Sequence, residues 1–237
     1  RDQQKYLKQK DQQSKILSSA GLLTNQKSIE ELFSAIEERV VNLDTGEYED
    51  SLDPKSFDGK KFEAEDYSRD PLTSIKLTTD VDISSLKRRE SFKKIYIYKE
   101  ENEIKAIILP VRGLGLWGTL YGYLAIESDL NTIIGLEYFS HKETPGLGAE
   151  VDNPRWKSQW KGKNIYSSTG EIKIEVIKGL VDPESPEKKY QVDGLSGATI
   201  TSRGVSNMLS FWLGELGYAK FLNRLKEEIE RKESLNV

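Results

Sequence analysis

Four apolar runs follow one another between residues 93 and 140, with only short polar links between them. They are KKIYIYKE (93–100), EIKAIILPV (103–111), GTLYGYLAIE (118–127) and TIIGLEYFS (132–140), and all are rich in β-branched and aromatic residues. Links this short join antiparallel neighbours, whereas parallel strands need a longer crossover. We therefore predict an antiparallel meander rather than βαβ units.

Helical periodicity appears on both sides of these strands. Ser28 and Glu31 form the S-x-x-E capping box, and the apolar residues after it recur at helical spacing, so we expect a helix over 28–43 that ends before Thr45-Gly46. Near the C-terminus one apolar stripe continues across two helices separated by Gly217. Its members are Val205, Met208, Leu209, Trp212, Leu213, Leu216, Phe221, Leu222, Leu225 and Ile229.

The rest of the chain gives weaker signals. Residues 1–20 read as a polar helix, either a segment that follows a membrane anchor or a frayed tail, and residues 44–90 read as irregular. We expect a short helix over 154–161 and a fifth strand over 171–179, EIKIEVIKG.

The order of helix, sheet and helix predicts an α+β fold, with a mostly antiparallel sheet flanked by N-terminal and C-terminal helices. We divide the chain into an N-terminal helical and irregular region (1–90) and a domain that holds the sheet (91–237).

Composition excludes several classes of function. The chain has no cysteine and one histidine, His141, so thiol catalysis, disulfides and multi-histidine metal sites are not expected. Its formal net charge of −4 gives nonspecific nucleic-acid binding no electrostatic support. No run is long enough to span a bilayer. Because the first residue is Arg1 rather than Met, we expect something to be missing upstream: a start codon, a signal peptide or a membrane anchor.

The stretch GLGLWG (113–118) matches the G-x-G-x-x-G pattern of dinucleotide-binding loops. That motif needs a strand before it and a helix after it, but here a second strand follows. We therefore interpret these glycines as part of a hairpin turn or bulge, or as a place where a flat ligand meets the backbone. Trp117 is either a stacking partner for such a ligand or a core residue.

The stretch SHKETPGLGAE (140–150) predicts a loop. Thr144-Pro145-Gly146 is typical of a tight turn, and Gly148 adds a second conformationally permissive position. Backbone N–H groups of such a loop can face a ligand. We interpret His141 as a surface or hydrogen-bonded side chain rather than a general base.

The stretch DGLSGATITS (193–202) immediately precedes the helical stripe, and Thr199, Thr201 or Ser202 could cap that helix. A helix N-terminus carries unpaired N–H groups and a partial positive charge, which favour a bound phosphate. Lys178 could add a cation. A simple turn with a cap remains the alternative.

DGLSGAT (193–199) resembles the flavinylation motif of the FMN-binding domain family, which begins with Asp and ends in (Ser/Thr)-Gly-Ala-Thr. ETPGLG (143–148) and GLWGTLYGY (115–123) are also similar to that family, in the same order and spacing. In that family a threonine hydroxyl carries FMN through a phosphoester, and this threonine maps to Thr199. The motif acid, read by the attaching enzyme, maps to Asp193.

The resemblance implies a covalent FMN cofactor and a surrounding site, with no catalytic side chain and no metal. The expected cofactor-binding residues are Thr199, Ser196, Gly197, Ala198, Leu116, Trp117, Gly118, Glu143, Thr144, Leu147, Gly148, Lys178 and Thr201. We expect the ring to lie between the 116–118 turn and the 144–148 loop.

The resemblance also implies partners and a location. It is strongest to the flavin-bearing subunit of a six-subunit, Na⁺-pumping NADH:quinone oxidoreductase. Such a protein is anchored in the bacterial inner membrane by an N-terminal helix, carries its flavin domain on the periplasmic side, and receives FMN from a flavin transferase that uses FAD. The alternatives are the matching flavin-bearing protein of a related ion-translocating electron-transport complex, a noncovalent flavin-binding module, and a structural domain with a degenerate site.

Overall fold

A computed structural model describes residues 2–57 and 69–235. Arg1, residues 58–68 of the segment expected to be irregular, and residues 236–237 lie outside this description. Within the described ranges no helix is both long enough and apolar enough to cross a membrane.

A five-stranded sheet in the described part of the chain has the order β1-β4-β5-β6-β7, and every neighbouring pair is antiparallel. The strands are β1 (Ile36–Asn42), β4 (Phe92–Glu100), β5 (Glu103–Leu114), β6 (Thr119–Glu127) and β7 (Ile133–Ser140). The predicted meander is confirmed as β4 to β7, and so is the α+β class.

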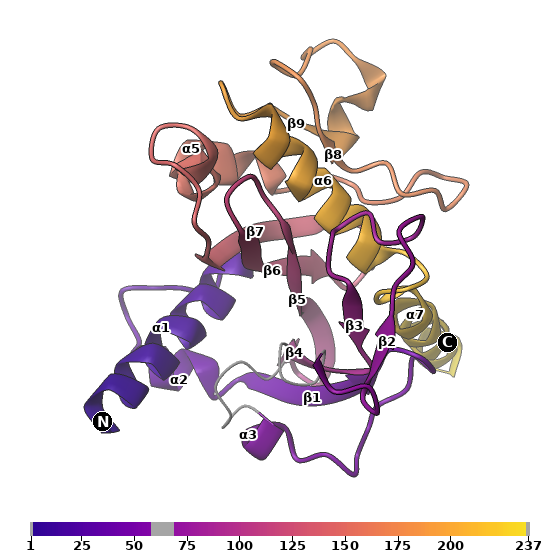
Figure 1. Cartoon of the computed structure of the whole chain (residues 1–237). Coiled ribbons are helices and arrows are strands. Elements are labelled where there is room, and N and C mark those ends of the chain that lie inside the picture. The colour runs from indigo at the N-terminus through magenta and orange to yellow at the C-terminus, as the bar shows by residue number, and fades with distance from the viewer. Residues whose placement is uncertain (1, 58–68, 236–237) are drawn as a thin grey trace.

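Helices cover both faces of the sheet, and Figure 1 shows it between them. On one side lie α1 (Asp2–Ser19) and α2 (Ile29–Phe33); on the other lie α6 (Thr199–Leu213) and α7 (Ala219–Leu235). Strand β4 shows the division, because Ile95 and Ile97 pack in the cluster with α6 and α7, whereas Tyr96 packs with α1. The central strands are therefore buried on both faces, and their apolar runs are continuous rather than alternating.

The first helix is packed over its C-terminal half. Ile16 and Leu17 of α1 are buried. Lys15 pairs with Glu137 of β7 at 3.1 Å, and the Ser18 hydroxyl donates to the same carboxylate at 3.1 Å. Residues 15–18 are thus fixed to the sheet, so the frayed-tail interpretation is wrong for this half of the helix.

The helix predicted over 28–43 is wrong beyond its first turn. The Ser28–Glu31 capping box is present, but α2 ends at Phe33, and Ile36–Asn42 is strand β1. β1 pairs with β4 in the register Ile36↔Tyr98. Pairing along an exposed strand edge, helped by the β-branched Val40 and Val41, outweighs the helical spacing of the apolar residues.

The strand predicted over 171–179 is present only in part. Within this range β8 (Glu175–Val176) joins β9 (Gln191–Val192) in a separate parallel pair, and Ile172 forms an isolated antiparallel bridge with Tyr166. The N–H of Val176 donates to the Ser206 hydroxyl of α6 at 2.9 Å. A helix side chain thus takes the hydrogen bond that a neighbouring strand would otherwise accept.

Shorter elements complete the chain: α3 (Pro54–Phe57), β2 (Ser74–Lys76), β3 (Arg88–Glu90), η1 (Gly148–Asp152), α5 (Pro154–Lys157), η2 (Ser158–Trp160) and η3 (Pro186–Tyr190). The short helix expected over 154–161 is confirmed as α5 and η2, and the two C-terminal helices are confirmed as α6 and α7.

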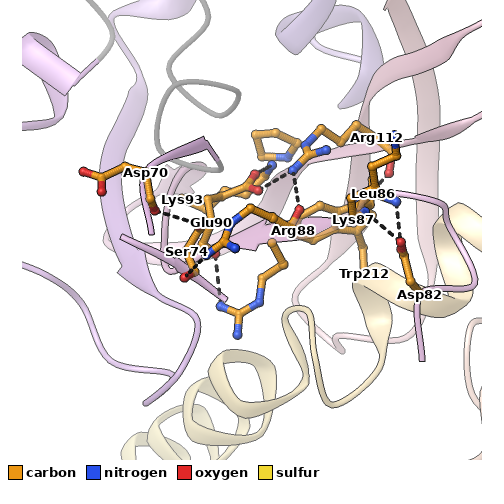
Figure 2. A network of polar contacts seen from close by, with 12 residues as sticks. Asp70, Ser74, Asp82, Leu86, Lys87, Arg88, Glu90, Lys93, Arg112 and Trp212 are labelled. Atoms are coloured by element: carbon orange, nitrogen blue, oxygen red, sulfur yellow. Dashed lines mark hydrogen bonds and ion pairs between the residues drawn. The ribbon is translucent and has the colours of Figure 1, made fainter. Parts of the chain in front are cut away.

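A buried ionic cluster joins β3, β4, β5 and α6 (Figure 2). Glu90 is fully buried and accepts from Lys93 at 2.5 Å and from Arg112 at 2.6 Å. The Lys93 ammonium lies 4.2 Å from the centre of the Trp212 ring, and the Trp212 indole N–H donates to the Arg112 carbonyl at 2.7 Å. The cluster therefore fixes α6 to the sheet.

Burial and the neighbouring charges shift the pKa values of Glu90 and Lys93. Burial opposes the charged form of Glu90, but the positive charges of Arg112 and Lys93 outweigh it and lower the pKa of Glu90 to about 2. Burial also lowers the pKa of Lys93 to about 8, against the opposing effect of Glu90.

Glu90→Gln leaves Lys93 and Arg112 buried without their anion, so we expect the free energy of unfolding to fall by about 3–5 kcal/mol. Glu103→Gln is the matched control, because it breaks the exposed Glu103–Lys105 pair and should change stability far less. Chemical denaturation of both variants measures the difference. Equal losses would contradict the role given to Glu90.

The stabilisation by Glu90 should also depend on pH. Because folding lowers its pKa from the ordinary 4.5 to about 2, this stabilisation is present above pH 4.5 and is lost as the pH falls toward 2. The difference in unfolding free energy between the wild type and Glu90→Gln should therefore shrink across this range. A difference that stays constant down to pH 2 would show that Glu90 does not titrate this way.

Candidate functional site

Three segments that are distant in sequence meet at the N-terminal end of α6. They are the turn 115–118 between β5 and β6, the loop 141–148 after β7, and the loop 193–198 that leads into α6. Contacts between them, described below, bring together the residues that the sequence singled out.

The turn 115–118 closes the β5–β6 hairpin. The N–H of Gly115 donates to the Gly118 carbonyl at 2.8 Å, and β6 follows directly. The dinucleotide-loop interpretation is therefore excluded, as expected. Leu116 and Trp117 project from the turn with 43% and 63% of their surface exposed, so Trp117 is not a core residue.

The loop 141–148 contains the predicted tight turn. The Leu147 N–H donates to the Thr144 carbonyl at 3.1 Å, and Gly146 has φ +75°. With Pro145 before it, this arrangement fits a type II turn. Thr144 and Leu147 are exposed, and Leu147 lies against Gly197 of the third segment.

Glu143 connects two of the segments to α6. Only 6% of its surface is exposed. Its Oε1 accepts the N–H groups of Leu116 and Trp117 at 3.0 Å each, and its Oε2 accepts the Thr201 hydroxyl at 2.5 Å. Glu143 and Thr201, both expected near the cofactor, thus point inward and bind each other.

His141 is hydrogen-bonded on both ring nitrogens. Its Nδ1 accepts the Glu143 N–H at 3.2 Å, so the proton of a neutral ring lies on Nε2, which faces the Asp152 carboxylate at 2.8 Å. This confirms the interpretation of His141 as a satisfied side chain. It leaves the ring no free nitrogen to act as a base.

The start of α6 differs from the expectation that a hydroxyl caps it. The N-cap residue is Ala198, which has no side-chain oxygen, and the Ser202 N–H donates to its carbonyl at 3.0 Å. Thr201 is fully buried on Glu143, and the Ser202 hydroxyl accepts the Leu195 N–H at 3.0 Å. Both hydroxyls are used to hold neighbouring loops, so neither caps the helix.

Thr199 is the first residue of α6, and it is exposed. In the part of the chain that the structure describes, its hydroxyl takes part in no hydrogen bond. The N–H groups at positions 199, 200 and 201 precede the first intrahelical bond and so have no acceptor within the helix. The end of α6 therefore presents a free hydroxyl beside unpaired N–H donors.

The loop before Thr199 is open on one side. Ser196 and Gly197 are exposed, and Gly197 has φ +69°, a conformation that glycine adopts without strain. Ala198 is buried. Lys178 is exposed, and its neighbour Gly179 accepts the Gly194 N–H at 2.8 Å, which places the Lys178 segment beside this loop.

Asp193 holds the loop from behind. Its carboxylate accepts the Val181 N–H at 2.7 Å and the Gln159 side-chain amide at 3.0 Å. Its own N–H donates to Gln159 at 3.0 Å, and its carbonyl accepts the Trp156 indole N–H at 2.8 Å. Asp193 therefore joins three chain segments at the base of the loop.

Sequence reasoning missed Trp156 and Gln159. Their spacing of three residues within the short helix expected over 154–161 places them on one face, which was the available signal. Nothing in the sequence indicated that this face meets the loop that contains Asp193.

Comparisons with known proteins place these segments within a known family domain. The profile of the FMN-binding domain family matches residues 115–214, which include all three. The NqrC protein of Pseudomonas aeruginosa, part of its Na(+)-translocating NADH-quinone reductase, is 46% identical over 92% of this chain and 83% of its own length. The corresponding protein from Vibrio alginolyticus is 39% identical over 96% of this chain and 86% of its own length.

Solved structures are similar as well. The crystal structure of NqrC from Shewanella oneidensis matches with a TM-score of 0.83 at 32% identity, over 93% of this chain and 99% of that one. The crystal structure of the corresponding protein from Parabacteroides distasonis matches with a TM-score of 0.64 at 31% identity, over 92% and 94%.

Asp193→Ala should loosen the loop before α6, because two donors lose their acceptor. We expect a loss of about 1–3 kcal/mol in stability and faster hydrogen exchange at the Val181 amide. Asp182→Ala is the control, since this exposed carboxylate accepts the local Glu184 N–H at 2.9 Å and, among the described residues, joins no distant segment. Unchanged exchange at Val181 in Asp193→Ala would show that the carboxylate does not order the loop.

Proposed function

We propose a function for this chain from the premise that it belongs to the NqrC family, whose members are subunits of the Na(+)-translocating NADH-quinone reductase. The chain contains an FMN-binding domain, and its relatives are components of an oxidoreductase complex. In this proposal Thr199 carries FMN covalently, and the flavin relays electrons between other subunits of the complex.

The free Thr199 hydroxyl is the observation that carries the proposal. It lies at the end of DGLSGAT, and the other two hydroxyls of the first turn, those of Thr201 and Ser202, are buried and hydrogen-bonded. A group attached to α6 at this point can reach solvent only from Thr199. The same position is the one that the motif assigns to the flavin.

The surroundings of Thr199 fit a phosphodiester. A phosphothreonyl link keeps one negative charge, which the unpaired N–H groups and the partial positive charge of the α6 N-terminus would stabilise. Ala198 and Gly197 keep bulky side chains away from this point, and Lys178 would add a cation nearby.

The ring of the flavin would lie over the exposed apolar side chains beside this end of α6. Leu116 and Trp117 of the hairpin turn and Leu147 of the following loop are each more than 40% exposed, so the segments that meet here present three large apolar side chains to solvent. Thr144 and backbone N–H groups of its loop would bond the ring edge, and Gly118 would let the ring approach the backbone. Gly148, also expected to contact the cofactor, is buried against Glu143 and would act only from behind the loop.

When bound, FMN supplies reversible electron transfer, and the protein supplies position and electrostatics. Electron relay needs no acid or base from the chain, which agrees with a site whose histidine is fully hydrogen-bonded. The covalent link keeps the cofactor at high effective concentration without tight noncovalent contacts.

Attachment would require a flavin transferase that uses FAD as the donor. The Thr199 oxygen would form a bond to the FMN phosphorus while the bond to AMP breaks, and AMP would leave. Asp193 would support this step by ordering the loop as well as by being read by the transferase.

We place the domain on the periplasmic side of the bacterial inner membrane, within a complex anchored there. The relatives described above all belong to the Na(+)-translocating reductase. Their shared identity favours this complex over the related ion-translocating electron-transport complex and its own flavin-bearing protein.

Thr199→Val removes the hydroxyl at nearly constant volume, so it should abolish covalent attachment. The chain, exported and co-expressed with a flavin transferase, should gain the mass of one FMN less one water after denaturation, and the variant should gain nothing. Thr199→Ser should restore the gain, at least in part. Thr169→Val, which removes an exposed hydroxyl outside the three segments of the site, should retain it.

Intact mass spectrometry of the denatured chains tests whether FMN is attached covalently at Thr199. A wild-type chain that gains no mass beside a working transferase would contradict covalent attachment and favour a noncovalent flavin-binding module. A mass gain that persists in Thr199→Val would place the link on another residue.

A further inference from the structure

Glu143 is a buried carboxylate without a cation. In the described part of the chain it forms no ion pair, and its stabilisation comes from two backbone N–H groups and one hydroxyl. Such an arrangement is costly to bury unless each bond is well made. The three donors come from two different elements, the 115–118 turn and the first turn of α6.

Two glycines make room for this carboxylate. A Cβ atom on Gly115 would come within 2.5 Å of Glu143 Oε1, and a Cβ atom on Gly148 would collide with Oε2. Gly148 does not have a positive φ, so it is required here for space rather than for its conformational freedom. The space that the Glu143 carboxylate needs therefore explains why positions 115 and 148 are glycine.

We propose that Glu143 is a positioning residue that holds the Leu116–Trp117 turn against α6 and places a fixed negative charge behind the cofactor site. We call the bonds from Glu143 to Leu116, Trp117 and Thr201 the clamp. Because the side chains of Leu116 and Trp117 remain exposed while their backbone N–H groups are bound, the clamp fixes the surface that would face the ring. Thr201 of α6 is the third partner of Glu143, so the clamp also fixes the position of the 115–118 turn relative to Thr199, two residues before Thr201.

The charge has a consequence that rests on the proposed function. A buried anion near a flavin disfavours the arrival of an electron, so it lowers the reduction potential. A unit charge about 10 Å away, at an effective dielectric constant of about 20, shifts such an equilibrium by on the order of tenfold. For one electron this is about 59 mV.

Glu143→Gln and Glu143→Ala separate the two roles. In Glu143→Gln the amide oxygen can still accept both N–H groups, and its NH₂ can donate to the Thr201 oxygen, so the clamp survives without the charge. Glu143→Ala removes both. Glu150→Gln is the control, because Glu150 is a nearby carboxylate whose side chain accepts from the Asn153 amide at 2.7 Å and does not contact the 115–118 turn among the described residues.

Hydrogen exchange at the Leu116 and Trp117 amides in the flavin-free chain tests the clamp. We expect exchange to be at least about tenfold faster in Glu143→Ala, little changed in Glu143→Gln and unchanged in Glu150→Gln. Thr201→Val, which removes one donor, should give a smaller increase and serves if Glu143→Ala does not fold. Wild-type rates in Glu143→Ala would overturn the clamp, and if that variant does not fold, wild-type rates in Thr201→Val would do so.

The midpoint potential of the flavin-loaded chain tests the charge. Glu143→Gln should still gain the mass of FMN, and its potential should rise by an amount equivalent to about tenfold in the equilibrium constant. An unchanged potential would overturn the electrostatic role. If even the wild type gains no flavin, the proposed function fails, but the exchange measurement still decides the clamp.

Discussion

The close approach of α6 to β5 is the constraint on which the rest of this structure depends. Gly204 of α6 lies so near the Leu114 carbonyl that any side chain there would collide with it, and Gly113 likewise faces Met208. Farther along, the Trp212 indole N–H bonds the Arg112 carbonyl at 2.7 Å, above the buried Glu90 cluster. These contacts hold the helix against the sheet at several points along its length, and Figure 1 shows α6 lying alongside the sheet.

Two carboxylates, the buried Glu143 and the half-buried Asp193, hold loops against the start of α6. Glu143 holds the hairpin turn on one side of the helix start, and Asp193 holds the preceding loop on the other. Between them Thr199 is left exposed, with the unpaired N–H groups of the first turn beside it. The site thus consists of a frame whose two carboxylates are satisfied internally and an exposed Thr199 hydroxyl that takes part in no hydrogen bond within the described residues. Such a frame suits a covalently held redox group, for which position matters more than acid–base chemistry.

The sequence predicted the elements whose patterns are local. The four strands from 93 to 140 and the two C-terminal helices are long and periodic, and the loop motifs lie where short turns demand glycine and proline. It did not predict β1, because the helical spacing of Ile36 and Val40 hides a segment that becomes a strand only when β4 is beside it. The uncapped start of α6 was equally hidden, since Thr201 and Ser202 are drawn inward by Glu143 and Leu195, partners supplied by the tertiary fold.

The most direct test of covalent attachment at Thr199 is a crystal structure of the chain after it has been exposed to a flavin transferase and FAD. We predict electron density that continues from the Thr199 hydroxyl oxygen into a phosphate at the N-terminus of α6. We also predict a ring against Leu116, Trp117 and Leu147, with Glu143 still bound to the two turn N–H groups. Density attached elsewhere, or a ring that displaces Glu143 from the turn, would contradict this prediction.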